Sequence, residues 1–229
     1  MLKNKNVLLL SAFSIIACIL HATVLHTPFN DYLYTSAFKV IVFVFCPMIY
    51  FKVSNEGSLK ELVSLFSMRR DAKNIKFTFL LGLGVFTFIV AFFIILQPFI
   101  DQTMVVEALE NNGITPNNAI FVFVYIVVIN AALEQFFFRG FVFMSLYNMG
   151  VKRYAHAFSS LLFSFYHIPI LFNAIAPGML ILCAAGLIVA GLIFNALTIK
   201  CKSISGSLIV HISANLALNM MIGIYFVFM

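Results

Sequence analysis

The chain has 229 residues, of which 63% are hydrophobic and 10% are charged, and its mean hydropathy is +1.07. Soluble domains are close to half apolar and a quarter charged, so this composition excludes a water-soluble globule. It also excludes a disordered chain and a disulfide scaffold. The net charge of +6 is small and lies in the loops, where it indicates membrane orientation rather than nucleic-acid binding.

The predicted fold is all-α, a single integral membrane domain over residues 1–229 built as a bundle of transmembrane helices. A helix needs about 20 apolar residues to cross the hydrocarbon core. Lipid offers no other partner to backbone polar groups in such segments, so each run should be helical. We expect about seven spans, within a range of six to eight, and no cleaved signal peptide. The spans cover residues 7–25, 33–51, 77–100, 119–148, 154–173, 178–199 and 204–228.

The basic residues predict the orientation of the bundle in the membrane. Of the 14 Lys and Arg residues, twelve precede the first span or follow the second, fourth and sixth spans. The loops on the other side (26–32, 101–118 and 174–177) contain no Lys or Arg. This asymmetry predicts a cytoplasmic N-terminus. The two remaining basic residues, Lys39 and Arg139, fall inside spans.

The N-terminal spans, residues 1–118, carry a basic cytoplasmic loop at 52–76. Apolar side chains recur there near helical spacing with charges between them, so we expect a short amphipathic helix on the membrane surface. The apolar positions are Leu59, Leu62, Val63, Leu65 and Phe66.

Ionisable side chains at membrane depth are costly and usually functional. Glu134 lies near the middle of the fourth span, His167 in the fifth and His211 in the seventh. By helical rise, Glu134 lies roughly 20 Å from either end of its span. Residues four apart share a helix face, and such pairs join Gln135 to Arg139, Phe163 to His167 and His211 to Asn215. We expect Glu134 and the two histidines to meet in one cavity that opens to the cytoplasm.

Two kinds of chemistry fit this set of side chains. Glu134, His167 and His211 form a plausible ligand set for a divalent metal such as zinc, which would activate a bound water. Alternatively no cofactor is needed, and Glu134 with His167 polarises a water directly. His211 and Asn215 would then donate hydrogen bonds to an oxyanion. Either route gives amide hydrolysis.

The motifs resemble those of the CPBP family, the CAAX proteases and bacteriocin-processing enzymes also called Abi proteins. The matching residues are Glu134, Gln135 and Arg139, then Phe163 and His167, then His211 and Asn215, within a core at 119–229. The resemblance implies an intramembrane endopeptidase that is glutamate- or metal-dependent. It implies that Glu134 and His167 activate water and that His211 and Asn215 stabilise the oxyanion. Gln135, Arg139 and Phe163 would support them.

One departure from the family pattern leaves two functions open. Gln135 stands where the family usually has a second glutamate. If that glutamate only positions its neighbours, a glutamine keeps the geometry and the enzyme is active. If it is chemically required, the chain is a non-catalytic membrane protein for bacteriocin self-immunity or a scaffold. We also expect Arg139 to bind Gln135, backbone carbonyls or a substrate carboxylate.

The expected partners are membrane lipid and a peptide or protein substrate, which could carry a lipid, and no nucleic acid. The resemblance implies CAAX trimming or the processing of pheromones or bacteriocin leaders, in a bacterial plasma membrane. The other histidines and the four cysteines are expected to be structural. These residues are His21, His26, His156, Cys18, Cys46, Cys183 and Cys201.

Overall fold

The computed structural model describes residues 2–25, 27, 31–54, 57–67, 74–172 and 174–228. Within these ranges the chain is helical and has no strand, as the composition predicts. The elements are α1 (Leu2–Val24), α2 (Tyr32–Ser54), α3 (Leu59–Ser64), α5 (Ile75–Leu96), η1 (Gln97–Phe99), α6 (Gln102–Asn111), α7 (Ala119–Tyr125), η2 (Ile126–Asn130), α8 (Ala131–Glu134), η3 (Gln135–Met144), α9 (Ser145–Asn148), α10 (Lys152–Leu171), α11 (Pro177–Cys201) and α12 (Ser205–Phe228).

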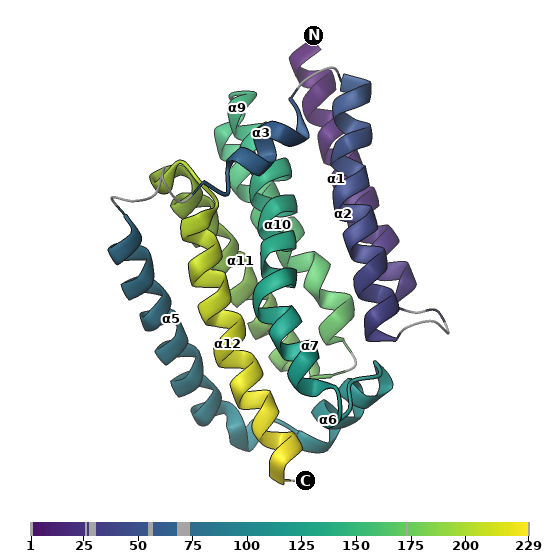
Figure 1. Cartoon of the computed structure of the whole chain (residues 1–229), viewed down its shortest axis with the longest axis vertical. Helices are drawn as coiled ribbons and strands as arrows, with labels where there is room; N and C mark the ends of the chain where they lie inside the picture. Colours follow the sequence, from purple (N-terminus) through teal and green to yellow (C-terminus); the bar gives the residue numbers. More distant parts are fainter. Residues whose placement is uncertain are drawn as a thin grey trace.

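Each of the seven predicted spans corresponds to one long helical segment. Among the described residues, six segments are both long and apolar enough to cross a membrane, and α10 is not one of them. This helix is more polar because it packs against α1, η3 and α11, so neighbouring helices rather than lipid surround much of it. The two ends of the chain lie at opposite ends of the bundle (Figure 1), as an odd number of crossings requires.

Local sequence signals explain where several helices begin and end. The Asp101 carboxylate caps α6 by accepting hydrogen bonds from the amides of Thr103 and Met104. Pro177 occupies the first turn of α11, where its missing N–H costs nothing. The same helix ends at Lys202, whose φ of 52° places it in the left-handed region.

The span at 119–148 is one continuous helical rod, in which two segments, η2 and η3, are π-helical and the rest is α-helical. A π-helix hydrogen-bonds from residue i to i+5, so it changes which side chains share a face. The segment η3 supplies much of the buried aromatic core, including Phe137, which stacks on Phe43 of α2 at 4.1 Å between ring centroids. The packing therefore links the N-terminal spans to the C-terminal core.

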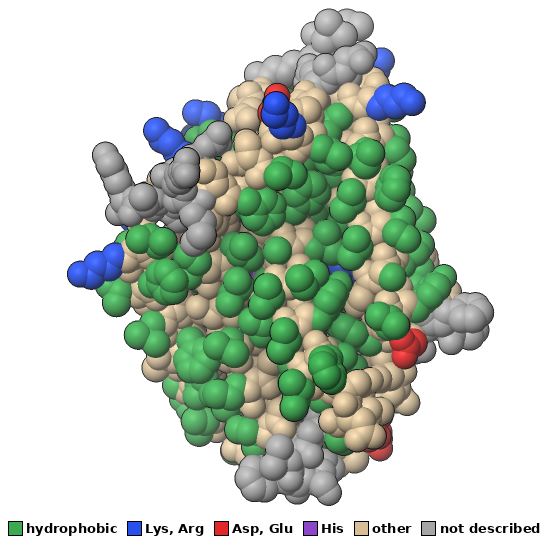
Figure 2. All heavy atoms as spheres, in the orientation of Figure 1, with side chains coloured by type: hydrophobic (Ala, Val, Ile, Leu, Met, Phe, Trp, Pro, Cys, Tyr) green, Lys and Arg blue, Asp and Glu red, His purple; other side chains and the backbone are tan. Residues whose placement is uncertain are grey.

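The outer surface matches a membrane protein with the predicted charge asymmetry. Figure 2 shows hydrophobic side chains over the middle of the visible face and Lys and Arg side chains toward the end that carries the N-terminus. The described acidic residues of the opposite loops, Asp31, Asp101, Glu107 and Glu110, are exposed. The helix α6, which carries the last two, lies at the end of the bundle away from the N-terminus (Figure 1). The helix α5 packs mainly on α12 and leaves most of its surface outward.

The predicted amphipathic helix is shorter than the pattern suggested. Only Leu59–Ser64 is helical, and the basic residues Arg69, Arg70 and Lys73 of this loop lie outside the described residues. The segment docks on the bundle through Leu62, which is buried. The Leu65 carbonyl next to it accepts hydrogen bonds from the Ile204 amide and the Ser203 hydroxyl. These two hydrogen bonds from the α11–α12 turn thus hold this segment against the protein.

The remaining structural predictions concern histidine and cysteine. His21 is buried in the bundle and His156 is half-buried, while His26 lies outside the described residues. All four cysteines are free thiols, two of them buried and two half-buried. They behave as small apolar residues of the spans.

Candidate active site

Glu134 lies at the end of α8 and is 1% exposed. Its two carboxylate oxygens have different surroundings. Oε1 accepts hydrogen bonds from Asn130 Nδ2 at 3.0 Å and from the Tyr166 hydroxyl at 3.4 Å, and it lies 3.6 Å from Lys39 Nζ. Oε2 has no hydrogen-bond partner among the described residues. One oxygen is therefore held in place and the other is free to act.

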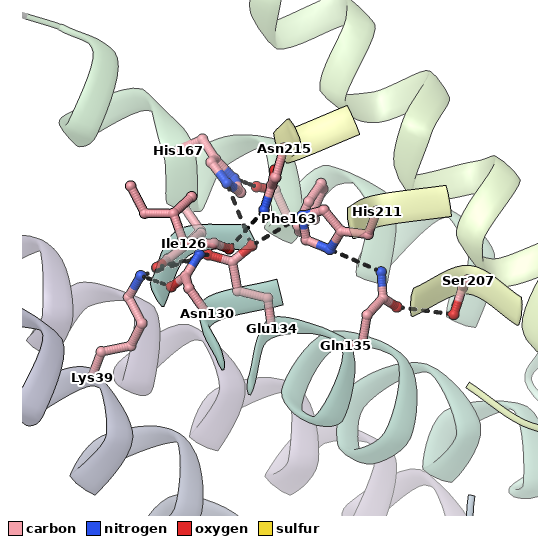
Figure 3. Close-up of polar contacts among 11 residues, drawn as sticks. Lys39, Ile126, Asn130, Glu134, Gln135, Phe163, His167, Ser207, His211 and Asn215 are labelled. Carbon is pink, nitrogen blue, oxygen red and sulfur yellow. Dashed lines mark hydrogen bonds and ion pairs between the residues drawn. The ribbon is translucent and has the colours of Figure 1, made fainter. Parts of the chain in front are cut away.

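The free oxygen faces two imidazoles from two other helices. The Nε2 atoms of His167 on α10 and His211 on α12 lie 3.7 and 3.6 Å from Glu134 Oε2. Figure 3 shows both rings directed toward the carboxylate. These distances exceed direct hydrogen-bonding range, and such a separation suits a bridging water or substrate atom. The structure thus brings together the three groups that the motif spacing placed on separate spans.

Hydrogen bonds at the far side of each ring determine which nitrogen carries the proton. His167 Nδ1 lies 2.7 Å from the carbonyl oxygen of Phe163, which can only accept. A neutral His167 therefore has its proton on Nδ1 and presents a lone pair on Nε2 to the site. His211 Nδ1 lies 3.1 Å from Gln135 Nε2, a donor, so its own proton is on Nε2. At the site, His167 Nε2 is therefore a hydrogen-bond acceptor and His211 Nε2 is a donor.

Gln135 supports His211 and does not contact the Glu134 carboxylate. Its side chain is fully buried, and its Oε1 accepts a hydrogen bond from the Ser207 hydroxyl at 3.1 Å. The Ser207 hydroxyl also lies 3.0 Å from the Ile204 carbonyl, so it has a second acceptor. In Figure 3 the chain of contacts runs from Ser207 through Gln135 to His211. The amide at position 135 therefore orients the ring that carries the donor.

Asn215 is one turn beyond His211 on α12 and is half-buried. Its Nδ2 donates a hydrogen bond to the Ile126 carbonyl at 3.1 Å, at the start of the π-helical segment η2. Asn219, four residues later, donates in the same way to the Phe123 carbonyl. An amide nitrogen has two protons, so Asn215 keeps one for another acceptor. The structure fixes its amide beside the site through backbone contact.

Arg139 differs from the sequence-based expectation. The predicted bonds to Gln135 or to backbone carbonyls are absent, because none of its guanidinium nitrogens has a hydrogen-bond partner among the described residues. The amide of Gln135 is engaged with His211 and Ser207 on α12 and is not available to the guanidinium. Arg139 is instead fully buried between the rings of Phe163 and Phe194, at 4.2 and 4.8 Å. These contacts are cation–π interactions, and Phe163 also supplies the carbonyl that orients His167.

The donor set does not fit a metal well. Among the residues that the structure describes, no group of three His, Cys, Asp or Glu side chains is arranged to hold an ion. In addition, the Lys39 ammonium already lies 3.6 Å from the Glu134 carboxylate and would repel a second cation there. A role for zinc therefore stays a prediction.

Sequence reasoning missed three polar side chains that contact the predicted site residues, namely Lys39, Tyr166 and Ser207. A signal existed for Lys39, since a basic residue inside a span usually has a specific partner. Tyr166 and Ser207 gave no such signal, because tyrosine and serine are common in membrane helices. Only the packing of α2, α10 and α12 around α8 and η3 brings these three residues to the site.

Comparison with known proteins identifies the region that holds most of these residues. A family model described as "Type II CAAX prenyl endopeptidase Rce1-like" matches residues 116–217. No curated protein and no solved structure matches the chain. The match confirms the family predicted from the motifs. It covers all seven motif residues, namely Glu134, Gln135, Arg139, Phe163, His167, His211 and Asn215.

Proposed function

Since residues 116–217 form an Rce1-like region of the CPBP family, we propose that this multi-pass membrane protein is an intramembrane endopeptidase that hydrolyses a peptide bond in a membrane-associated substrate. The family match supports a CAAX-type protease in general. One observation supports catalysis by this chain: Glu134 Oε2 has no hydrogen-bond partner among the described residues and faces the Nε2 atoms of His167 and His211.

The proposed first step is activation of water by Glu134 and His167. Oε2 and His167 Nε2 are both acceptors, so one water can donate a hydrogen bond to each of them. This arrangement directs a water lone pair at the scissile carbonyl carbon. Glu134 takes the proton as the carbon–oxygen bond forms, and it later gives the proton to the leaving amine nitrogen. The bond broken is the amide C–N bond, and the products are a carboxylate and an amine.

The proposed second element is an oxyanion site formed by His211 and Asn215. The Nε2–H of His211 is the donor that Gln135 orients toward the site. The amide proton of Asn215 that is not bonded to Ile126 would be the second donor. Preorganised donors at the developing negative charge are commonly the largest contribution to catalysis of this type. In this scheme the buried Arg139 stabilises Phe163 and hence the orientation of His167.

The proposed substrates are apolar or lipid-modified peptides at the cytoplasmic side of a bacterial plasma membrane. CAAX-type trimming and the processing of pheromones or bacteriocin leaders all involve such peptides. Because Glu134 is buried among helices that are apolar over their outer surface, a substrate must present its peptide bond within the membrane protein. The basic ends of the helices indicate the cytoplasmic side.

A non-catalytic immunity or scaffold protein is the alternative that Gln135 left open. The hydrogen bonds of Gln135 to His211 and Ser207 favour catalysis, because they give this residue a positioning role that glutamine can perform. A chemical role for a second glutamate would instead require position 135 to face the reacting groups around Oε2.

The test is a peptidase assay on purified protein in detergent or vesicles, with prenylated CAAX peptides and leader peptides as candidate substrates. Glu134→Gln keeps the side-chain shape and should lower the rate about 10²- to 10⁴-fold, the usual contribution of a general base. Glu107→Gln on the exposed surface of α6 is the matched control and should cleave normally. Each reaction is repeated with a chelator, which we expect to leave the rate unchanged. Cleavage by Glu134→Gln at the wild-type rate would contradict the proposal.

A further inference from the structure

Lys39 is a buried cation that comes from outside the Rce1-like region. It lies on α2, is 8% exposed, and belongs to the N-terminal spans rather than to residues 116–217. Its Nζ donates a hydrogen bond of 2.7 Å to Asn130 Oδ1 and lies 3.6 Å from Glu134 Oε1. It also lies 5.3 Å from the centre of the Tyr166 ring. A charged side chain at this depth is stable only with partners, and these contacts provide them.

The contacts of Lys39 fall on one oxygen of the carboxylate. Oε1 faces Lys39, Asn130 and Tyr166, whereas Oε2 faces the two imidazoles. Figure 3 shows Lys39 and Asn130 on one side of Glu134, away from the Gln135–Ser207 pair. A carboxylate can rotate about its last side-chain bond and exchange its two oxygens. Holding Oε1 from three directions therefore keeps Oε2 directed at the imidazoles.

We propose that Lys39 is a positioning residue for Glu134, so that the N-terminal spans complete the active site. Lys39 holds Asn130 by a direct hydrogen bond and supplies the counter-charge to the carboxylate, and Asn130 in turn donates to Oε1. As a catalytic inference this rests on the proposed function, but the physical coupling of Lys39 to Glu134 does not. The two statements can be tested separately.

The first experiment measures the coupling without any substrate. Thermal unfolding in detergent is recorded for wild type, Lys39→Met, Glu134→Gln and the double variant. Removing one partner of a buried ion pair leaves an uncompensated charge, so Lys39→Met should lower Tm strongly when Glu134 is present. In the Glu134→Gln background the same change should lower Tm much less, because the stability effects of substitutions at two interacting residues are not additive. Equal decreases in both backgrounds would overturn the proposal.

The second experiment measures cleavage by the same proteins, adjusted to equal amounts of monodisperse protein. Lys39→Met should lower kcat about 100-fold with little change in KM, because a misplaced catalytic group affects the chemical step. Lys39→Arg keeps the positive charge and should retain a larger share of kcat. Thr35→Val, one turn earlier on α2, is the control, since among the described residues the Thr35 hydroxyl bonds within its own helix, to the Tyr32 carbonyl.

The outcomes separate the two proposals. Wild-type cleavage by Lys39→Met, or an equal loss in Lys39→Arg and Lys39→Met, would overturn the positioning role. A wild-type protein that cleaves none of the peptides would overturn the proposed function instead, and the unfolding cycle would still decide whether Lys39 holds Glu134.

Discussion

The Gln135→Leu variant is the sharpest test of what Gln135 does at the position where the family usually has a second glutamate. Leucine has a similar volume and no polar atoms, so it removes the Gln135 amide without leaving a large cavity. The change leaves His211 Nδ1 without its partner in a fully buried position. Ser207 loses one contact but keeps the Ile204 carbonyl as its acceptor. The change therefore leaves one buried polar atom, His211 Nδ1, without a hydrogen-bond partner, while the Ser207 hydroxyl keeps one.

The expected size of the effect follows from this count. One unsatisfied buried polar group costs about 1–3 kcal/mol of folding stability. The effect on activity should be larger than stability alone explains, since His211 is free to change tautomer and to turn its Nε2 proton away from the oxyanion. Loss of a side chain that orients a functional imidazole lowers activity by about 10- to 100-fold. We expect this decrease in kcat, at equal amounts of folded protein.

The matched variant is Gln135→Glu, which places the usual family residue at this position. A carboxylate only accepts hydrogen bonds, so it would hold an imidazole that is protonated on both nitrogens. Nε2 would still donate to the oxyanion, and Ser207 would still donate to the side chain at 135. Gln135→Glu should therefore remain active, while Gln135→Leu should not.

The assay is peptide cleavage by both variants, with Tm measured in parallel. Wild-type kcat in Gln135→Leu would refute the argument that Gln135 orients His211. A loss in Gln135→Glu as large as that in Gln135→Leu would show that the amide itself, with its donor, is required.

Two further predictions concern packing and orientation. Gly191→Ala on α11 places a Cβ 2.9 Å from Ser160 Cα of α10, so the helices must separate at a cost of about 1–3 kcal/mol. Gly186→Ala on the same helix meets nothing within 4 Å and is the control. Similar Tm values for the two variants would contradict the close approach of α10 and α11. For orientation, a membrane-impermeant maleimide applied to intact spheroplasts should label Glu107→Cys but not Lys60→Cys, both exposed, and the reverse pattern would contradict a cytoplasmic N-terminus.

The helical architecture could be predicted because lipid restricts a span to one backbone structure. Length and hydropathy therefore located the long helices from sequence, including the polar α10. On the regular helix α10 the spacing of motif residues also predicted a contact correctly. Phe163 and His167, four apart, do meet through the Phe163 carbonyl.

The same rule failed for Gln135 and Arg139, which are also four apart but do not bond to each other. Arg139 lies against the rings of Phe163 and Phe194. The residue spacing does not show which partners the neighbouring helices bring to each side chain. The partners of Gln135 are instead His211 and Ser207 on α12, more than 70 positions away in sequence.

The charged side chains inside the membrane are paired in a way that the sequence alone does not predict. Within the predicted spans the chain has one acidic residue, Glu134, and two basic residues, Lys39 and Arg139. Sequence alone permits either cation to pair with the carboxylate. A guanidinium is planar and weakly hydrated and can be buried against aromatic rings, whereas an ammonium needs oxygen acceptors. Arg139 accordingly lies between Phe163 and Phe194, and Lys39 binds Asn130 and Glu134. The difference in hydration between the two cations thus accounts for the arrangement in which α2, outside the Rce1-like region, reaches the Glu134 carboxylate.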